Sequence, residues 1–269
     1  MIFEKEFQTA ITAAKNAGKY LKDNQEKVII QQQKNNNKNY ATKQDIQSDK
    51  IIIDTIRSNF PNDPILSEES TPKLKNKTRI WIIDPLDGTR NYANGLPYYS
   101  ISIVLFQDEE LKLGVVYAPS YNNELYHAVK GQGAFLNNKS LETLNQNQTL
   151  NSSIIATGFV YFKGKELKKP LELYEKVLNQ STDVVRFGSA ALDLCHVATG
   201  RIGAYFESGL KPWDLAAGIL ILQEQKGIIS DYKNNKLDIF KSKEEKFSID
   251  ILSSQNNTIH SELSLILKK

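Results

Sequence analysis

Four apolar segments rich in β-branched and aromatic residues follow one another between residues 79 and 129, and they constrain the fold more than any other feature. They read RIWIID, YYSISIVLF, KLGVVYA and ELYHAV, and turn residues such as KGQG separate or follow them. Segments of this kind, joined by short turns, are typical of neighbouring antiparallel strands. The sequence therefore predicts a largely antiparallel sheet in the N-terminal part of the chain.

Past residue 150 the pattern changes to an alternation of strands and helices. The predicted strands read SIIATG, VVRFG, AYFES, GIISD and FSIDILSS. Between them lie the predicted helices LKKPLELYEKVLNQ, SAALDLCHVATG and WDLAAGILILQEQKG, and a last helix ends the chain. This alternation indicates a second layered αβ lobe. No long linker divides the chain, so we expect one α+β domain over 1–269, with fused lobes of about 1–150 and about 151–269.

Two amphipathic helices are predicted before the first sheet, with a polar stretch between them. In the first, apolar residues recur at helical spacing, namely Phe3, Phe7, Ile11, Ala14 and Leu21. The second presents Ile46, Ile52, Ile53 and Ile56 and ends at Asn59-Phe60-Pro61. The stretch QQQKNNNKNYATKQD, residues 31–45, is polar and of low complexity, and composition alone favours a solvated loop.

The charge balance and the N-terminus exclude several classes of protein. The 34 basic and 31 acidic residues are interspersed and give a net charge of only +3, which is not the electrostatic footprint of a nucleic-acid-binding protein. The first residues lack the apolar core of a signal peptide, and no segment is apolar enough to span a membrane. Cys195 is the only cysteine, so no internal disulfide can form. We therefore expect a cytoplasmic protein without nucleic-acid or membrane partners.

The segment WIIDPLDGTRN brings two carboxylates to the end of a strand. We expect a strand over residues 80–83 and a tight turn over 84–88, in which Asp84 and Asp87 repel each other unless a cation lies between them. A short helix or turn starting at Thr89 would add free N–H groups that can hold an anion. A bare D-x-x-D-G is equally consistent with an Asp-rich turn in which Thr89 is a helix N-cap.

Three motifs in order carry a resemblance to a known family. The string D-P-x-D-G-T at 84–89 resembles the first signature of the inositol monophosphatase family, and WDLAAG at 213–218 resembles its second. An acidic element, Glu68-Glu69-Ser70, precedes the first signature as it does in that family. Taken alone, Glu68 and Glu69 would be a solvated acidic loop, and Asp214 a helix N-cap. The resemblance covers nearly the whole chain.

The resemblance implies a fold and a set of metal ligands. The family is related to fructose bisphosphatase, so we expect a layered αβαβα sandwich. Its members are Mg²⁺-dependent, lithium-sensitive phosphatases, which implies two or three Mg²⁺ ions here. Carried over by position, the first metal matches Glu68, Asp84 and the carbonyl of Leu86, and the second matches Asp84, Asp87 and Asp214. Hard oxygen ligands of this kind suit Mg²⁺.

The resemblance also implies which residues take part in catalysis. A threonine backed by an aspartate activates the attacking water in the family, and these match Thr89 and Asp45. A lysine on the loop before them matches Lys34, which makes part of the polar stretch a candidate lid. The family's D-x-V-T at this place reads Asn39-Tyr40-Ala41-Thr42 here.

Substrate contacts follow from the same comparison. Gly88 and Thr89 match phosphate contacts, and Gly188, Ser189 and Ala190 match a backbone segment that contacts the sugar. Glu207 stands seven residues before Asp214, where inositol monophosphatases carry an acid that binds a ring hydroxyl. On its own it would be a strand-end acid at the surface. These residues favour a small phosphate ester, above all inositol 1-phosphate.

Other assignments stay open from the sequence. A 3′(2′),5′-bisphosphate nucleotidase or a fructose-1,6-bisphosphatase would share most of these residues, and some bacterial relatives are regulatory binding proteins. Lys211, three residues before Asp214, falls where contacts vary between members. The three histidines and Cys195 have no metal-ligand spacing and are expected to pack in the interior or lie at the surface. Relatives are commonly homodimers, and we expect the same here.

Overall fold

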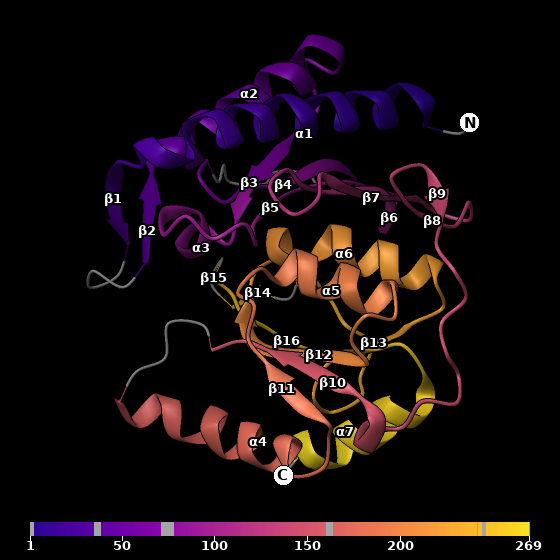
Figure 1. The fold of residues 1–269 in the computed structure, drawn as a ribbon. Coiled ribbons are helices and arrows are strands. Elements are labelled where there is room, and N and C mark those ends of the chain that lie inside the picture. The colour runs from indigo at the N-terminus through magenta and orange to yellow at the C-terminus, as the bar shows by residue number, and fades with distance from the viewer. Residues whose placement is uncertain are drawn as a thin grey trace.

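The protein is described by a computed structural model that covers residues 3–34, 39–70, 78–159, 164–240, 242–243 and 246–268. Five layers follow one another from top to bottom (Figure 1). Helices α1 (Glu4–Asn24) and α2 (Lys43–Asn59) cover a seven-stranded sheet, and α5 (Ala190–Ala198) and α6 (Pro212–Glu224) form the middle layer. A five-stranded sheet and then α4 (Lys168–Leu178) and α7 (Asn257–Leu267) complete the stack. The predicted αβαβα sandwich is therefore confirmed.

The seven-stranded sheet is built in the order β3-β4-β5-β6-β7-β8-β9. Its strands are β3 (Ile65–Ser67), β4 (Arg79–Asp87), β5 (Ser100–Gln107), β6 (Glu110–Ala118), β7 (Glu124–Val129), β8 (Ala134–Leu136) and β9 (Lys139–Ser140). All neighbours are antiparallel except β3 and β4, which run parallel. This confirms the largely antiparallel sheet predicted from the short turns.

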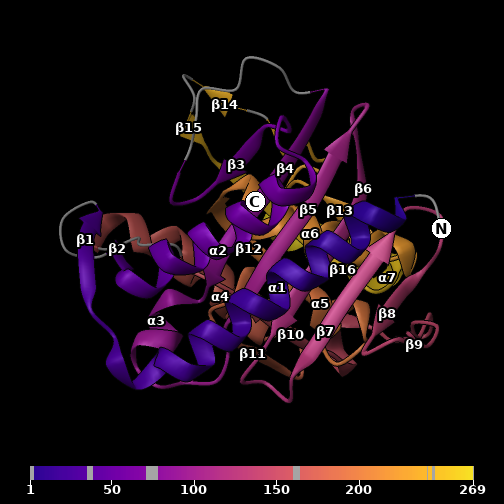
Figure 2. The ribbon, with the colours of Figure 1, turned by 90° about the horizontal axis from the view of Figure 1, so that it is seen from above.

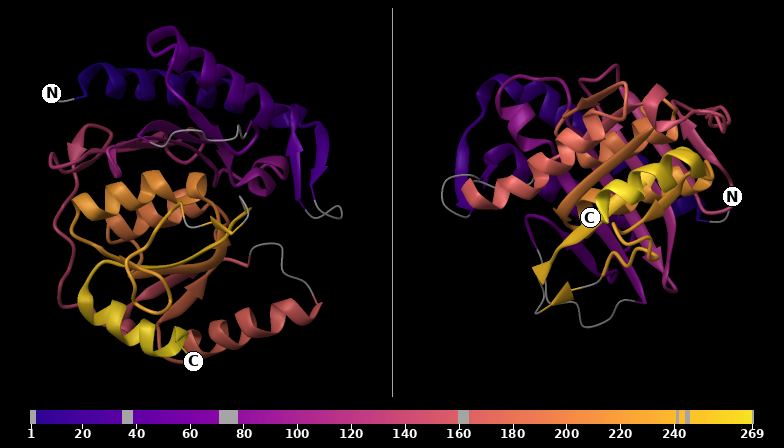
Figure 3. Two further views of the ribbon diagram at one scale, coloured as in Figure 1. Left: turned by 180° about the vertical axis from the view of Figure 1, so that it is seen from behind. Right: turned by 90° about the horizontal axis from the view of Figure 1, so that it is seen from below.

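The five-stranded sheet is mixed and is ordered β11-β10-β12-β16-β13. Its strands are β10 (Ile154–Thr157), β11 (Asp183–Val185), β12 (Ala204–Leu210), β13 (Ile228–Ser230) and β16 (Ile249–Ser254). Strand β10 pairs in parallel with both β11 and β12, whereas β16 is antiparallel to both of its neighbours. Each predicted strand past residue 150 is present. Helices α4 and α7 lie against the lower face of this sheet (Figure 3).

The polar stretch between the first two helices is not the loop that we predicted. Strands β1 (Ile30–Lys34) and β2 (Asn39–Thr42) pair in antiparallel register, and α2 begins at Lys43. The prediction was wrong because it rested on composition, whereas strand pairing satisfies backbone groups whatever the side chains. Helices α1 and α2 cross above the seven-stranded sheet (Figure 2). Phe7, Leu21, Ile52 and Ile56 are buried beneath them, as the periodicity predicted.

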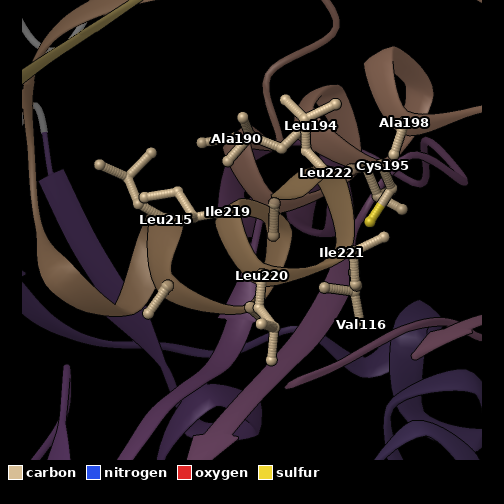
Figure 4. Packing of buried hydrophobic residues seen from close by; sticks show 14 of the residues in the cluster. Val116, Ala190, Leu194, Cys195, Ala198, Leu215, Ile219, Leu220, Ile221 and Leu222 are labelled. Carbon is tan, nitrogen blue, oxygen red and sulfur yellow. The ribbon is translucent and has the colours of Figure 1, made fainter. Parts of the chain in front are cut away.

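The middle layer carries most of the buried apolar surface between the two sheets. Leu194 and Cys195 of α5 pack close to Leu222 and Ile221 of α6, with Val116 of β6 beneath them (Figure 4). Because both faces of this helix pair are covered by sheets, α6 is apolar all round rather than on one stripe. All three histidines and Cys195 are buried, as expected of packing residues.

Short elements complete the chain. They are α3 (Thr89–Ala93), the hairpin of β14 (Ser242–Lys243) and β15 (Lys246–Phe247), and the 3₁₀ turns Gln25–Lys27, Leu150–Ser152 and Gly164–Leu167. Within the part of the chain that the structure describes, no helix combines the length and the apolar character needed to cross a bilayer.

Candidate metal and phosphate site

The two aspartates of the D-P-x-D-G-T motif lie on a β-bulge. Strand β4 continues to Asp87, but its pairing with β5 shifts between Asp84 and Asp87, which face Ser102 and Ser100 respectively. The predicted turn over 84–88 is therefore wrong in detail, since most of it belongs to the strand. Pro85 has no N–H to donate and fits a bulge, where a ladder bond is missing. Its carbonyl accepts a 2.7 Å hydrogen bond from the Ser48 hydroxyl.

Three carboxylates from distant parts of the chain meet beside this bulge. Carboxylate oxygens of Glu68, Asp84 and Asp214 all lie within 4.8 Å of one another. Burial raises the pKa of Asp84 well above its ordinary value, and repulsion from Glu68, Asp87 and Asp214 raises it further. The pKa of Asp214 is raised in the same way, first by burial and then by Glu68 and Asp87. The arrangement costs free energy unless positive charge compensates it.

Local contacts hold two of these carboxylates in place. Glu68 follows β3 on a segment fixed by Asp49 of α2, which accepts hydrogen bonds from Ser67 at 2.5 Å and Ser70 at 2.9 Å. Asp214 is the third residue of α6 and accepts a 2.7 Å bond from the backbone N–H of Lys211. The alternative prediction that Asp214 is the N-cap residue is thus wrong, because Lys211 holds that position, although the Asp214 carboxylate does cap the backbone of this helix end.

Asp87 is held differently from the other three acids. Its Oδ2 accepts from the Ser189 hydroxyl at 2.6 Å and from the Ala191 N–H at 2.8 Å, at the start of α5. Burial raises the pKa of Asp87 to about 6, although these hydrogen bonds oppose the rise. Asp87 is not among the three acids that approach within 4.8 Å. Asp87 therefore links the seven-stranded sheet to the middle helix layer, and it also lies near the acidic group.

Thr89 and Asp45 are brought together as the resemblance implied. The Thr89 hydroxyl lies 2.9 Å from Asp45 Oδ1 and 3.0 Å from the Leu86 carbonyl. Gly88 precedes α3 with φ +88°, which places the N-cap at Gly88 rather than at Thr89. Only glycine adopts this conformation at little cost, which explains the glycine of the motif. Burial raises the pKa of Asp45 to about 6, while bonds from Thr42 and Thr89 lower it.

A cavity of about 350 Å³ opens in front of these groups. Most of the predicted site residues line it, namely Glu68, Asp84, Leu86, Asp87, Gly88, Thr89, Gly188, Ala190, Glu207 and Asp214. Asp45 and Ser189 stand behind the lining, because they bond to Thr89 and Asp87 respectively. Lys34 ends β1, and its side chain lies outside the described residues.

Several lining residues were not predicted. Arg90, Asn91, Gly158, Phe159, Arg186 and Trp213 complete the wall, together with Lys211. Arg186 is two residues before Gly188 and, together with Arg90 and Lys211, brings positive charge to the cavity that the acidic group lines. The sequence could have indicated Arg186, because it lies next to residues 188–190, which were already predicted to contact the substrate. Gly158 ends a predicted strand, and its place beside the cavity depends on strand pairing that the sequence does not reveal.

Glu207 lies on β12 and faces the cavity. Its Oε2 accepts a 2.7 Å hydrogen bond from the hydroxyl of Tyr205, which is fully buried. Burial raises the pKa of Glu207 to about 7, whereas Tyr205 and Arg186 oppose the rise. The alternative of a solvated strand-end acid is wrong, because the side chain is half-buried against the cavity wall.

The donor set fits a hard divalent cation. Carboxylate and carbonyl oxygens are the ligands that Mg²⁺ prefers, and the described acidic group contains no nitrogen or sulfur ligand. The mutual repulsion that raises the pKa of Asp84 is what a bound cation would relieve. The residues therefore suit a magnesium site next to an anion-accepting cavity.

Comparison with known proteins identifies the family and supports the fold. The family model described as the inositol monophosphatase family matches residues 4–259. The chain belongs to the inositol monophosphatase family. This confirms the resemblance carried by the three motifs, and members of the family are generally Mg²⁺-dependent phosphatases.

Individual relatives within the family carry two kinds of name. A protein of Haemophilus influenzae named Nus factor SuhB is 42% identical over 226 residues, which cover 83% of this chain and 84% of that protein. The structure of extragenic suppressor protein SuhB from Bartonella henselae has a TM-score of 0.88 at 31% identity and covers 99% of both chains. Inositol monophosphatase from Anabaena has a TM-score of 0.84 at 31% identity and covers 100% of this chain and 97% of its own.

Proposed function

We propose that the protein is a Mg²⁺-dependent phosphomonoesterase that hydrolyses small polyol phosphates, with inositol 1-phosphate as the favoured substrate. The observation that carries the proposal is the group of Glu68, Asp84 and Asp214, whose carboxylate oxygens lie within 4.8 Å of one another at the wall of a cavity that Arg186 also lines. Membership of the inositol monophosphatase family supports it.

The metal ligands in this proposal are the carboxylates of Glu68, Asp84, Asp87 and Asp214 and the carbonyl of Leu86. Bound Mg²⁺, as two or three ions, would neutralise phosphate charge and lower the pKa of a bound water. The Ser189 hydroxyl and the Ala191 N–H both donate to Oδ2 of Asp87, which fixes this carboxylate near the other acids.

Thr89 and Asp45 position the nucleophile in this proposal. The Thr89 hydroxyl donates to Asp45, so its lone pairs can accept a hydrogen bond from the attacking water, and as the water gives its proton to Thr89, the Thr89 proton passes to Asp45. Asp45 also accepts from the backbone N–H of Thr42 at 2.7 Å, within the capping box that begins α2. Because Asp45 is held by Thr42, it offers the Thr89 hydroxyl a fixed acceptor, as general base chemistry requires.

Thr89→Ala should lower kcat for inositol 1-phosphate by about a hundredfold or more, because it removes the hydroxyl that orients the water. Thr89→Ser keeps that hydroxyl and is expected to retain most of the activity. Initial rates at saturating Mg²⁺ measure both variants. Equal losses in the two would show that the methyl group matters and the hydroxyl does not, and would contradict the assigned role.

Substrate choice in this proposal rests on Glu207 and the segment Gly188–Ala190. A carboxylate at the wall of the cavity can accept hydrogen bonds from hydroxyls of a cyclic polyol. Arg186 supplies a counter-charge near the same wall. The 3′(2′),5′-bisphosphate nucleotides and fructose 1,6-bisphosphate are the alternative substrates within the same chemistry.

A substrate panel tests the proposal. Phosphate release is measured with Mg²⁺, with and without lithium, from inositol 1-phosphate, adenosine 3′,5′-bisphosphate, fructose 1,6-bisphosphate and NADP. We expect hydrolysis of inositol 1-phosphate that requires Mg²⁺ and is inhibited by lithium. No turnover of any of the four would overturn the enzymatic proposal, and a preference for the nucleotide would overturn the role given to Glu207.

The relatives named Nus factor SuhB support a second candidate, namely that this chain acts as a Nus factor. The expected absence of a nucleic-acid partner stays a prediction without support, as does the homodimer. A bacterium deprived of its own Nus factor SuhB can be complemented with this chain and with an Asp84→Asn variant. Rescue by both would show a role independent of the acidic site, and rescue by neither would contradict this second function.

A further inference from the structure

Gly158 lies directly beside Glu207 because of the pairing of their strands. Strand β10 runs parallel to β12, with Thr157 opposite Phe206, and the Thr157 hydroxyl bonds to the Phe206 carbonyl at 2.7 Å. The next residue on each strand is therefore Gly158 and Glu207. Both line the cavity.

The Glu207 carboxylate occupies the space that a side chain at residue 158 would need. A Cβ added to Gly158 would lie 1.8 Å from Oε2, 2.1 Å from Cδ and 2.3 Å from Oε1 of Glu207. All three nearest atoms belong to this one carboxylate, and no backbone atom is among them. The φ of Gly158 lies outside the left-handed region, so the backbone itself would accept alanine. The nearest obstacle to a side chain at this position is therefore the Glu207 carboxylate.

The same carboxylate is fixed by Tyr205. Its hydroxyl donates to Oε2 at 2.7 Å, and its ring is fully buried two residues away on β12. Among the described residues, Oε1 of Glu207 has no hydrogen-bond partner. One oxygen is thus held by the protein, and the second is left for a ligand in the cavity.

We propose that Gly158 and Tyr205 are positioning residues that set the substrate specificity of the site, by seating the Glu207 carboxylate where it meets a substrate hydroxyl. The proposal rests on the proposed phosphatase function, and it gives a structural cause for the preference for polyol phosphates. Any side chain at residue 158 displaces the carboxylate without changing its chemistry. Such a site should lose its preference for polyol phosphates over phosphates without hydroxyls.

Gly158→Ala tests this proposal by comparing inositol 1-phosphate with phenyl phosphate, which has no ring hydroxyl. The ratio of the two kcat/KM values should fall about tenfold to a hundredfold, as expected for a lost hydrogen bond to a charged group. The loss should appear mainly in KM for inositol 1-phosphate. Tyr205→Phe, which removes only the hydroxyl, should shift the ratio in the same direction.

A double-mutant cycle separates positioning from a general effect on folding. In a Glu207→Ala background, adding Gly158→Ala should change the ratio no further, because the displaced group is already absent. Additive effects would overturn the inference. A crystal structure of Gly158→Ala gives a readout that needs no activity: the Glu207 carboxylate should have moved and lost its bond to Tyr205, and an unmoved carboxylate would contradict us.

The outcomes for the two proposals are distinguishable. If the wild type hydrolyses both substrates and Gly158→Ala leaves their ratio unchanged, only the positioning role is overturned. If the wild type hydrolyses neither substrate, the phosphatase proposal itself fails. If the ratio falls and the cycle is non-additive, Gly158 acts through Glu207.

Discussion

Asp84→Asn is expected to lower kcat for inositol 1-phosphate by about a thousandfold while the fold is preserved. Asp84 is the residue assigned to both metal positions, and its carboxylate lies within 4.8 Å of Glu68 and Asp214. Asparagine is nearly isosteric, and its amide oxygen can still accept the 3.0 Å bond from the Leu86 N–H. The change therefore removes negative charge and leaves the bulge intact.

The measurement combines kinetics with Mg²⁺ titration. We expect the Mg²⁺ concentration for half-maximal activity to rise together with the fall in kcat, since a ligand has been lost. Asp54→Asn, an exposed aspartate on α2, is the matched control and should behave as wild type. Near-normal turnover by Asp84→Asn would show that the acidic group is not the metal centre.

The sequence predicted the elements that carry long apolar segments, and it failed where the backbone alone decides. The strands at 79–129 and the helices past 150 carry apolar patterns that burial imposes. The hairpin of β1 and β2 has no such pattern, because most of its residues are polar and strand pairing needs only backbone groups. The bulge at Asp84–Asp87 was missed for a similar reason, since a proline and a glycine predict a turn as readily as an irregular strand.

The sequence predicted which residues form the candidate site but not how these residues contact one another. Motif order was enough to select Glu68, Asp84 and Asp214, which lie far apart in the chain and meet in space. The bond of Asp87 to the start of α5 could not be foreseen, because it depends on how the first sheet packs on the middle layer. The contact of Gly158 with Glu207 depends on a parallel register that no local pattern encodes.

Without divalent cations, the contribution of the acidic site to the free energy of unfolding should fall as pH rises from about 4 toward 7. The pKa values of Asp84 and Asp214 are raised by burial and then by neighbouring acids, and that of Asp87 is raised by burial to about 6. The folded state thus keeps protons that the unfolded chain has lost. This contribution is fully present below the ordinary pKa of 3.8 and is lost as pH passes the raised values.

Histidines act in the opposite direction over part of the same range, so the comparison must be between variants. Burial lowers the pKa of His196 and His260 to about 4, which favours the folded state as pH rises toward 6.5. Asp214→Asn leaves both histidines unchanged and keeps an acceptor for the Lys211 N–H. Relative to wild type, this variant should therefore gain stability on going from pH 5 to pH 8.

Addition of Mg²⁺ should make the wild type more stable than Asp214→Asn at pH 8. Cation binding requires ionised ligands, so Mg²⁺ should raise the Tm of the wild type more at pH 8 than at pH 5. At a Mg²⁺ concentration a hundred times Kd, the free energy of unfolding should rise by about 2.7 kcal/mol. Asp214→Asn should gain little at either pH. Denaturation of both proteins in chelator and in Mg²⁺ measures all four conditions. In chelator at pH 8, Asp214→Asn should be more stable than the wild type. Equal or lower stability of the variant would show that the carboxylates do not repel one another enough to require a cation.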